Sequence, residues 1–261
     1  MYIGIMNTVK KAKLNTLLSS QPAGIVLTSS WLAGQGYSLE LQKQYRKSQW
    51  FDSIGTGALV RHGDPVDYLG GVYALQTQLG LTVHPAGKTA LSMQGKSHYL
   101  ELSAKKAQLF GGVDDALPLW FKKHDWGLSL DCKLSSFLPP ELGLVEYAHK
   151  SFKVKISSPA RAVMECLYLA PKAQPILEVF ELMEGLNNLR PAVVQALLEG
   201  CNSVKVKRLF LYLADKAGHD WMAYLKLDKV DLGSGKRAIV SDGVYVSKYQ
   251  ITVPRELEKH V

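Results

Sequence analysis

The residues best suited to bind a nucleotide are Gly87-Lys88-Thr89, which match the end of a phosphate-binding loop. That motif, G-x-x-x-x-G-K-[ST], uses backbone amides, a lysine and a hydroxyl to hold phosphates and magnesium. It also needs a glycine at position 82, where this chain has Thr82, and a buried strand before it, where this chain has His84-Pro85. A nucleotide-binding enzyme that uses Gly87-Lys88-Thr89 is therefore an alternative interpretation, not the main one.

Other catalytic patterns are missing from the sequence. None of the seven histidines belongs to an H-E-x-x-H pair or lies at ligand spacing from a cysteine, so no metal site is predicted. Asp114-Asp115 follows two glycines and fits a solvated loop better than a pair of acid-base carboxylates. No serine lies in a G-x-S-x-G elbow. We therefore expect neither an enzyme nor a cofactor.

A basic helix offers a different chemistry, the binding of nucleic acid. The sequence predicts a helix over Leu39–Ser48 with Ser38 as its N-cap. At about 100° per residue, Leu41 and Tyr45 fall on the side that packs inward. The remaining surface is expected to present amide and cationic groups to base edges and phosphates of DNA, with Ser38 and Lys47 nearer the backbone. The residues expected to face outward are Gln42, Lys43, Arg46 and Lys47.

The elements around this helix predict a winged helix-turn-helix. A first helix spans Thr8–Ser19, a second carries Trp31, and Gly34 and Gly36 make a tight turn before the basic helix. Strands over 50–54 and 58–61 then form a hairpin around Gly55-Thr56-Gly57. In this wing, Thr56 at the tip and Arg61 at the base are expected to contact phosphates or the minor groove.

Beyond the wing, the sequence predicts an α+β chain with two domains. Asp64-Pro65 is expected to open a helix that ends near Leu79, and a short helix follows over 87–94. Because short strand candidates and loops follow Gly95, the predicted domains are 1–95, a winged helix-turn-helix domain, and 96–261, a mixed domain. The elements predicted in the second domain are strands at 107–110, 128–134, 152–156 and 244–253, and helices at 158–169, 176–185, 191–200 and 204–217.

Composition places the chain among ordinary globular proteins. Its 261 residues carry a net charge of +8, which permits a nucleic-acid partner without requiring one. The three cysteines are widely spaced and fit buried thiols in a reducing compartment. No apolar run approaches the roughly 18 residues of a membrane span, and no signal peptide is evident. A cytoplasmic protein that does not contact a membrane is expected.

A second cationic cluster lies near the start of the helix predicted over 204–217. Lys205, Lys207 and Arg208 place positive charge where the helix dipole is also positive, an unfavourable position that an acidic or phosphate-bearing partner would offset. Intramolecular pairing with Glu199 or Asp215 would offset it equally well. An RNA-binding module that uses this cluster is the second alternative.

Several blocks of the sequence resemble the AbiEi-type antitoxins of type IV toxin–antitoxin systems, a family of bacterial transcriptional regulators. The resemblance covers nearly the whole chain, and the order of the later blocks is more specific than the helix-turn-helix itself. The blocks are LTSSWLAGQGYSLELQKQYRKSQWFDSIGTGALVRHGDPVD, HPAGKTALSMQG, KISSPARAVMECLYL, SVKVKRLFLYLADKAGHDW, DLGSGKRAIV and KYQITVPREL.

The resemblance implies a repressor that binds inverted repeats in the promoter of its own operon through the N-terminal domain. It also implies that the C-terminal domain counters a nucleotidyltransferase-like toxin, usually without a stable complex. The chain would be a monomer in solution or a cooperative pair on DNA. By motif position, the DNA-contact role carries over to Ser38, Gln42, Lys43, Arg46, Lys47 and Thr56, and no catalytic residue carries over.

Overall fold

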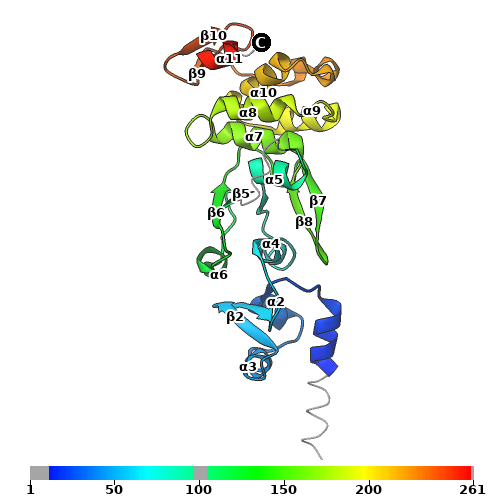
Figure 1. The fold of residues 1–261 in the computed structure, drawn as a ribbon. Helices are drawn as coiled ribbons and strands as arrows, with labels where there is room; N and C mark the ends of the chain where they lie inside the picture. The colour runs from blue at the N-terminus through cyan, green and yellow to red at the C-terminus, as the bar shows by residue number, and fades with distance from the viewer. Residues whose placement is uncertain (1–11, 97–104, 260–261) are drawn as a thin grey trace, which may run out of the picture. The chain divides into compact units, whose positions relative to one another are not determined.

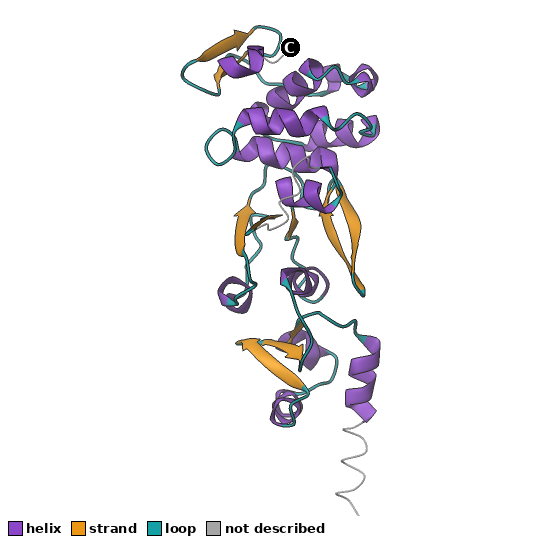
Figure 2. Cartoon of the chain, in the orientation of Figure 1, coloured by secondary structure: helices purple, strands orange, loops and turns teal. Residues whose placement is uncertain are grey.

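The computed structural model describes residues 12–96 and 105–259 and divides the chain into two compact units. Unit 1 comprises Met1–Gly80, Leu117–Gly127 and Tyr147–Val154; unit 2 comprises Leu81–Ala116, Leu128–Glu146 and Lys155–Val261. Both units contain helices and strands, which confirms the predicted α+β class (Figure 2). The chain passes between the units more than once, and the single boundary at Gly95 stays a prediction.

Unit 1 has the order of elements of a winged helix-turn-helix (Figure 1). A helix over 12–20 comes first; the part of the predicted helix before residue 12 lies outside the described residues. The three-stranded antiparallel sheet has the order β1-β3-β2, with Leu27 opposite Leu59 and Phe51 opposite Arg61. The next elements are β1 (Leu27–Thr28), α2 (Ser29–Gly34), α3 (Leu39–Lys47), β2 (Phe51–Gly55), β3 (Ala58–Arg61) and α4 (Tyr68–Thr77).

Helix caps decide where the helices of unit 1 begin. The Ser38 side chain accepts a hydrogen bond from the amide of Leu41 at 3.3 Å, which confirms the predicted N-cap of α3. The prediction that α4 opens at Asp64-Pro65 is wrong. Asp67 caps that helix instead, because its Oδ1 accepts from the amides of Leu69 and Gly70 at 3.0 and 3.3 Å.

A later segment of the chain completes unit 1 and was not predicted. Helix α6 (Leu119–Lys123) packs on β2 so closely that a Cβ added at Gly55 would lie 2.8 Å from the Cβ of Trp120. Trp126 donates its indole N–H to the carbonyl of Phe121 at 2.9 Å, and both rings lie against Gly71 of α4. A side chain at position 55 would clash with the Cβ and Cα of Trp120, and one at position 71 would clash with the rings of Phe121 and Trp126, so both positions need glycine.

Unit 2 is organised around α7, whose residues 160–167 are all buried. Helices α8, α9 and α10 contact α7, and Figure 1 shows them stacked together. In the sheet of β4 (His84–Pro85), β5 (Lys106–Gly111) and β6 (Ser129–Leu134), β5 pairs antiparallel with β4 and parallel with β6. The helices of this unit are α5 (Gly87–Met93), α7 (Pro159–Leu169), α8 (Ile176–Glu184), α9 (Pro191–Gly200), α10 (Val204–Lys216), η1 (Asp220–Tyr224), η2 (Leu227–Lys229) and α11 (Arg255–Lys259).

The sequence located the helices of unit 2 better than its strands. Ser158 caps α7 as predicted, by accepting from the amide of Arg161. The strand expected over 244–253 is two strands that pair antiparallel. The strands from residue 84 onward are β4 (His84–Pro85), β5 (Lys106–Gly111), β6 (Ser129–Leu134), β7 (Leu144–His149), β8 (Phe152–Ser157), β9 (Arg237–Ala238), β10 (Gly243–Val246) and β11 (Ile251–Pro254). Strands β4, β7 and β9 were missed, and the expectation that His84-Pro85 is not a buried strand is wrong, because both residues are buried and pair with β5.

Replacing Asp67 should destabilise unit 1. Its other oxygen, Oδ2, pairs with His149 Nε2 at 2.8 Å and Lys150 Nζ at 3.0 Å. Burial alone would raise the pKa of Asp67, but the hydrogen bonds from Lys150 and His149 outweigh it and lower that pKa. We expect Asp67→Ala to lower the free energy of unfolding by about 1–2 kcal/mol, since the cap and the pairing are lost together.

The measurement is urea unfolding followed by tryptophan fluorescence, which reports mainly on unit 1 because four of the five tryptophans belong to it. Asp114→Ala is the control, since Asp114 is exposed and its loss should change stability by less than about 0.5 kcal/mol. Equal effects of the two substitutions would show that Asp67 does not fix the start of α4.

Candidate nucleic-acid interface

The outer face of α3 carries cations. Leu41 and Tyr45 are buried at 9% and 6% exposure and fix the inner face of the helix. Lys43, Arg46 and Lys47 are all exposed. Within residues 12–96 and 105–259, none of these three cations pairs with a carboxylate. Their charges are therefore available to a ligand. Arg46 and Lys47 also stabilise α3 itself, because they lie in its last turn, near the negative end of the helix dipole.

Gln42 lies inside the protein, so the prediction that its amide faces outward is wrong. Its side chain is 4% exposed. The Nε2 group donates to the carbonyl of Tyr37 at 2.8 Å and to that of Ser29 at 3.1 Å. These bonds join α3 to the start of α2 and to the turn between the two helices. Gln42 therefore positions the helix and does not reach a base edge.

The wing presents Thr56 at its tip. Gly55 and Gly57 flank it with φ angles of 149° and 83°, which glycine adopts without steric strain and other residues rarely adopt. Thr56 is exposed, and the carbonyl of Gly57 accepts a hydrogen bond from the amide of Ser29 at 2.9 Å. The tip is thus tied to the start of α2, and the roles of Thr56 and of Ser38, which is also exposed, remain predictions.

Arg61 does not extend from the base of the wing. Its guanidinium donates to the carbonyl of Leu18 at 2.8 Å and also to the carbonyl of Gln21. These carbonyls lie at the end of the first helix, where a cation stabilises the dipole and satisfies free carbonyl groups. The prediction of a phosphate contact by Arg61 is replaced by a structural role in holding the first helix against β3.

The cluster at the start of α10 is also turned inward. Lys207 and Arg208 are buried at 4% and 2% exposure, and Lys205 donates to the carbonyls of Tyr168 and Ala170 at 2.9 and 2.6 Å. Arg208 donates only to backbone oxygens, namely those of Leu232, Gly233, Gly235 and Gln250. The predicted patch for a partner or nucleic acid is therefore not a surface feature. Instead of the alternative pairing with Glu199 or Asp215, Lys205 and Arg208 bind carbonyl groups.

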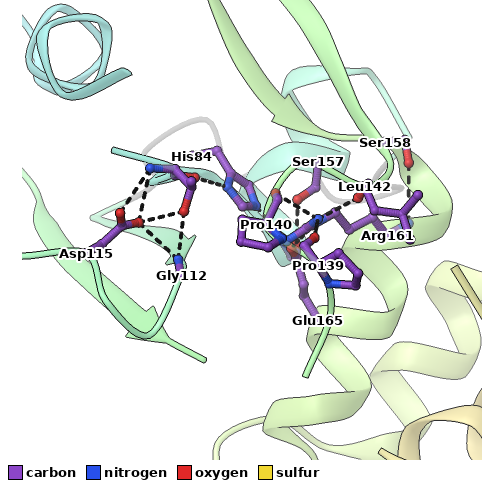
Figure 3. A network of polar contacts seen from close by, with 12 residues as sticks. His84, Gly112, Asp115, Pro139, Pro140, Leu142, Ser157, Ser158, Arg161 and Glu165 are labelled. Atoms are coloured by element: carbon purple, nitrogen blue, oxygen red, sulfur yellow. Dashed lines mark hydrogen bonds and ion pairs between the residues drawn. The ribbon is translucent and has the colours of Figure 1, made fainter. Parts of the chain in front are cut away.

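The segment that resembles a phosphate-binding loop lies in unit 2 and binds Glu165, a member of the polar network drawn in Figure 3. The amide of Gly87 donates to Glu165 Oε2 at 3.0 Å, and the amide of Lys88 donates to Gln108 Oε1 at 2.8 Å. The Lys88 ammonium pairs with Glu178 at 2.8 Å. The amides and the lysine that would hold a phosphate thus bind side chains of the protein itself, and the Thr89 hydroxyl accepts from the amide of Gln108 at 2.8 Å.

Glu165 is the centre of this network. It is fully buried, and it accepts hydrogen bonds from Arg161 Nε at 2.8 Å and Ser157 Oγ at 2.7 Å, with His84 Nε2 at 3.2 Å. Burial raises its pKa, but the hydrogen bond and charge of His84 and the charge of Arg161 outweigh burial and lower it. The carboxylate is held ionised by its own surroundings and is closed to solvent.

Asp115 is joined to this network through Thr82, whose carbonyl oxygen lies 2.7 Å from His84 Nδ1. Its carboxylate accepts from the Thr82 hydroxyl at 2.7 Å and from the amide of Gly112 at 3.0 Å, whereas Asp114 is exposed (Figure 3). The described residues contain no group of three His, Cys, Asp or Glu side chains that could hold a metal ion. No helix in that part of the chain has the length and apolar character needed to cross a membrane.

These features define the class of the protein: a two-unit α+β protein whose first unit is built in the order of a winged helix-turn-helix. Comparison with protein families then identifies it. Residues 10–102 match the AbiEi antitoxin N-terminal domain of transcriptional regulators, and residues 104–254 match the AbiEi antitoxin of type IV toxin–antitoxin systems, a transcriptional regulator. The chain belongs to the AbiEi antitoxin family of transcriptional regulators.

A solved structure shares the fold. The crystal structure of the RV2827C protein from Mycobacterium tuberculosis superposes with a TM-score of 0.58, covering 97% of this chain and 94% of that one. At 13% sequence identity the likeness concerns the fold alone. No curated protein matches this chain significantly in sequence.

The burial of Gln42 leads to a stability prediction. Gln42→Ala removes both hydrogen bonds and leaves the carbonyls of Tyr37 and Ser29 without this donor, so the free energy of unfolding should fall by about 1–3 kcal/mol. Gln44→Ala on the same helix is the control, because Gln44 is only partly buried and makes no such pair of bonds. Urea unfolding measures both, and a loss no greater than that of Gln44→Ala would contradict the positioning role.

The buried network around Glu165 leads to a second stability prediction. Glu165→Ala leaves His84 and Arg161 buried without their carboxylate and should cost about 3–5 kcal/mol, measured by urea unfolding and far-UV circular dichroism. Glu141→Ala is the control. It removes an exposed ion pair with Lys155, so the free energy of unfolding should fall by at most about 1 kcal/mol.

The same network predicts a pH dependence. Because the folded-state pKa of Glu165 is lowered, its contribution is complete above the unfolded-state value of about 4.3 and is lost as the pH falls below it. Acid titration of the wild-type protein and Glu165→Gln should therefore converge in stability at low pH. Curves that stay parallel down to the acid transition would contradict the assignment.

Proposed function

We propose that this AbiEi-family regulator represses its own operon by binding promoter DNA through unit 1, with α3 in the major groove and the wing beside it. The observation that carries the proposal is the row of exposed cations Lys43, Arg46 and Lys47 on α3, none of which has a carboxylate partner among the described residues. Binding of these cations to DNA phosphates would release counterions from the DNA, and this release contributes favourable binding free energy.

Each exposed group has a distinct task in this proposal. Arg46 has the planar donor array that binds the O6 and N7 atoms of guanine, and Lys43 reaches either a base edge or a phosphate. Lys47 and the hydroxyl of Ser38 lie toward the ends of α3 and would contact the backbone. Thr56 at the wing tip would add a phosphate or minor-groove contact. Inverted repeats would then be occupied by two copies of the chain.

Unit 2 is proposed to provide the antitoxin activity against a nucleotidyltransferase-like toxin. The support is the match of residues 104–254 to the AbiEi antitoxin family, because most of that range belongs to unit 2. We propose that the protein acts in the cytoplasm without catalysis and without a stable toxin complex. An RNA-binding role for Lys205, Lys207 and Arg208 has less support, because these cations bind carbonyl groups or are buried.

Arg46→Ala tests the assignment of α3. The full-length variant should bind the duplex upstream of its own gene about 10- to 100-fold more weakly in a gel-shift titration, the loss expected for one bidentate base contact. If Arg46 binds a phosphate instead, the slope of log affinity against log salt should become shallower by about 0.9. Arg190→Ala is the matched control, because Arg190 is an exposed arginine in unit 2.

Each alternative to the proposed function predicts a different experimental result. Equal affinity of Arg46→Ala and wild type for the promoter duplex would remove the recognition-helix assignment. Displacement of the duplex by equimolar single-stranded RNA of the same sequence would favour the RNA-binding alternative. A rise in melting temperature with ATP and magnesium would favour the nucleotide-binding alternative at Gly87-Lys88-Thr89.

A further inference from the structure

The first residue of α3 is an exposed leucine. Leu39 is 69% exposed, although the residues that follow it on the helix include buried Leu41 and Tyr45. At about 100° per residue, Leu39 lies on the line between Lys43 and Arg46, in the middle of the outward face. Its side chain thus contributes little to the core and stands among cations.

Leu39 also lies at the N-terminal end of α3. In helix-turn-helix proteins the N-terminal residues of the second helix contact base edges. Ser38 caps this end of the helix by accepting a hydrogen bond from the amide of Leu41. A leucine at this position has no donor or acceptor to offer, so only an apolar feature of the DNA can complement it.

We infer that Leu39 determines sequence specificity by packing on the C5-methyl group of a thymine. This inference rests on the proposed function, because it requires α3 to lie in the major groove. Thymine alone among the four bases displays a methyl group at the edge facing that groove, and apolar side chains recognise it there. Lys43 and Arg46 on either side would hold the neighbouring polar edges and phosphates.

The surroundings of Leu39 favour DNA over a protein partner. An apolar protein surface would have to bury Lys43 and Arg46 together with the leucine, and burying an unpaired cation is costly. A duplex supplies phosphates for these cations and a methyl group for the leucine within the same groove. This face therefore fits a DNA groove better than it fits an apolar protein surface.

The test removes the methyl group from the DNA. The preferred site of the full-length chain is selected from a random duplex library, and each thymine of that site is replaced in turn by 2′-deoxyuridine. For the wild type, one thymine in each half-site should weaken binding about fourfold when replaced, the value of one buried methyl group. Leu39→Ala should bind the thymine site at least about fourfold more weakly and should not distinguish thymine from uracil there.

Leu119→Ala is the matched control, because Leu119 is 64% exposed in the same unit but lies on α6. It should keep both the affinity and the sensitivity to uracil of the wild type. Leu39→Ala should melt at the wild-type temperature, since alanine is a good helix former and the side chain is exposed.

Three results would overturn the inference. The first is uracil sensitivity that persists in Leu39→Ala, and the second is a site at which no thymine methyl matters; both leave DNA binding by α3 intact. The third is unchanged DNA affinity of Leu39→Ala with an altered oligomeric state by light scattering, which would assign Leu39 to a protein contact. A wild-type chain that selects no sequence would instead refute the proposed function.

Discussion

The structure of unit 1 depends on the way α3 is held by its inner face. Leu41 and Tyr45 are buried, and Gln42 donates to the carbonyls of Ser29 and Tyr37. A side-chain amide that satisfies two backbone carbonyls fixes both the rotation of the helix and its distance from α2, because leaving buried carbonyls unpaired would cost more than the bonds themselves contribute. The cations face outward as a consequence of this rotation.

The positive charge of the chain is divided between two uses. Arg61, Arg161, Lys205 and Arg208 direct their donors at backbone carbonyls at the ends of helices and in loops. There they join segments distant in sequence, as Arg208 does for α10 and the loop over 232–235. The net charge of +8 therefore overstates what the surface offers to a polyanion. The outward cations of α3 are significant because they are not used in this way.

The sequence predicted what local patterns decide. Ser38 and Ser158 were identified as caps because serine followed by a helical pattern is a short-range signal, and the hairpin followed from Gly55 and Gly57. The predicted direction of the Gln42 side chain was wrong, because a side-chain amide can bind either water or backbone carbonyls. The two carbonyls that it binds belong to the start of α2 and to the turn before α3, and their position depends on the fold. The packing of α6 was not predicted, because the residue that it contacts, Gly55, lies far away in the sequence. The outward position of Leu39 could have been predicted from the sequence, because it is an apolar residue that lies between Lys43 and Arg46 on the helical wheel.

The segment Gly87-Lys88-Thr89 shows why a motif alone does not decide function. In a phosphate-binding loop, backbone amides and a lysine surround an external anion. Here the amide of Gly87 also binds an anion and the lysine also pairs with one, but the anions are the side chains of Glu165 and Glu178. The chemistry of the residues is the same in both cases, and only the source of the negative charge differs. Because that source is decided by the packing of α7 and α8 against α5, only the fold separates a ligand site from a polar core.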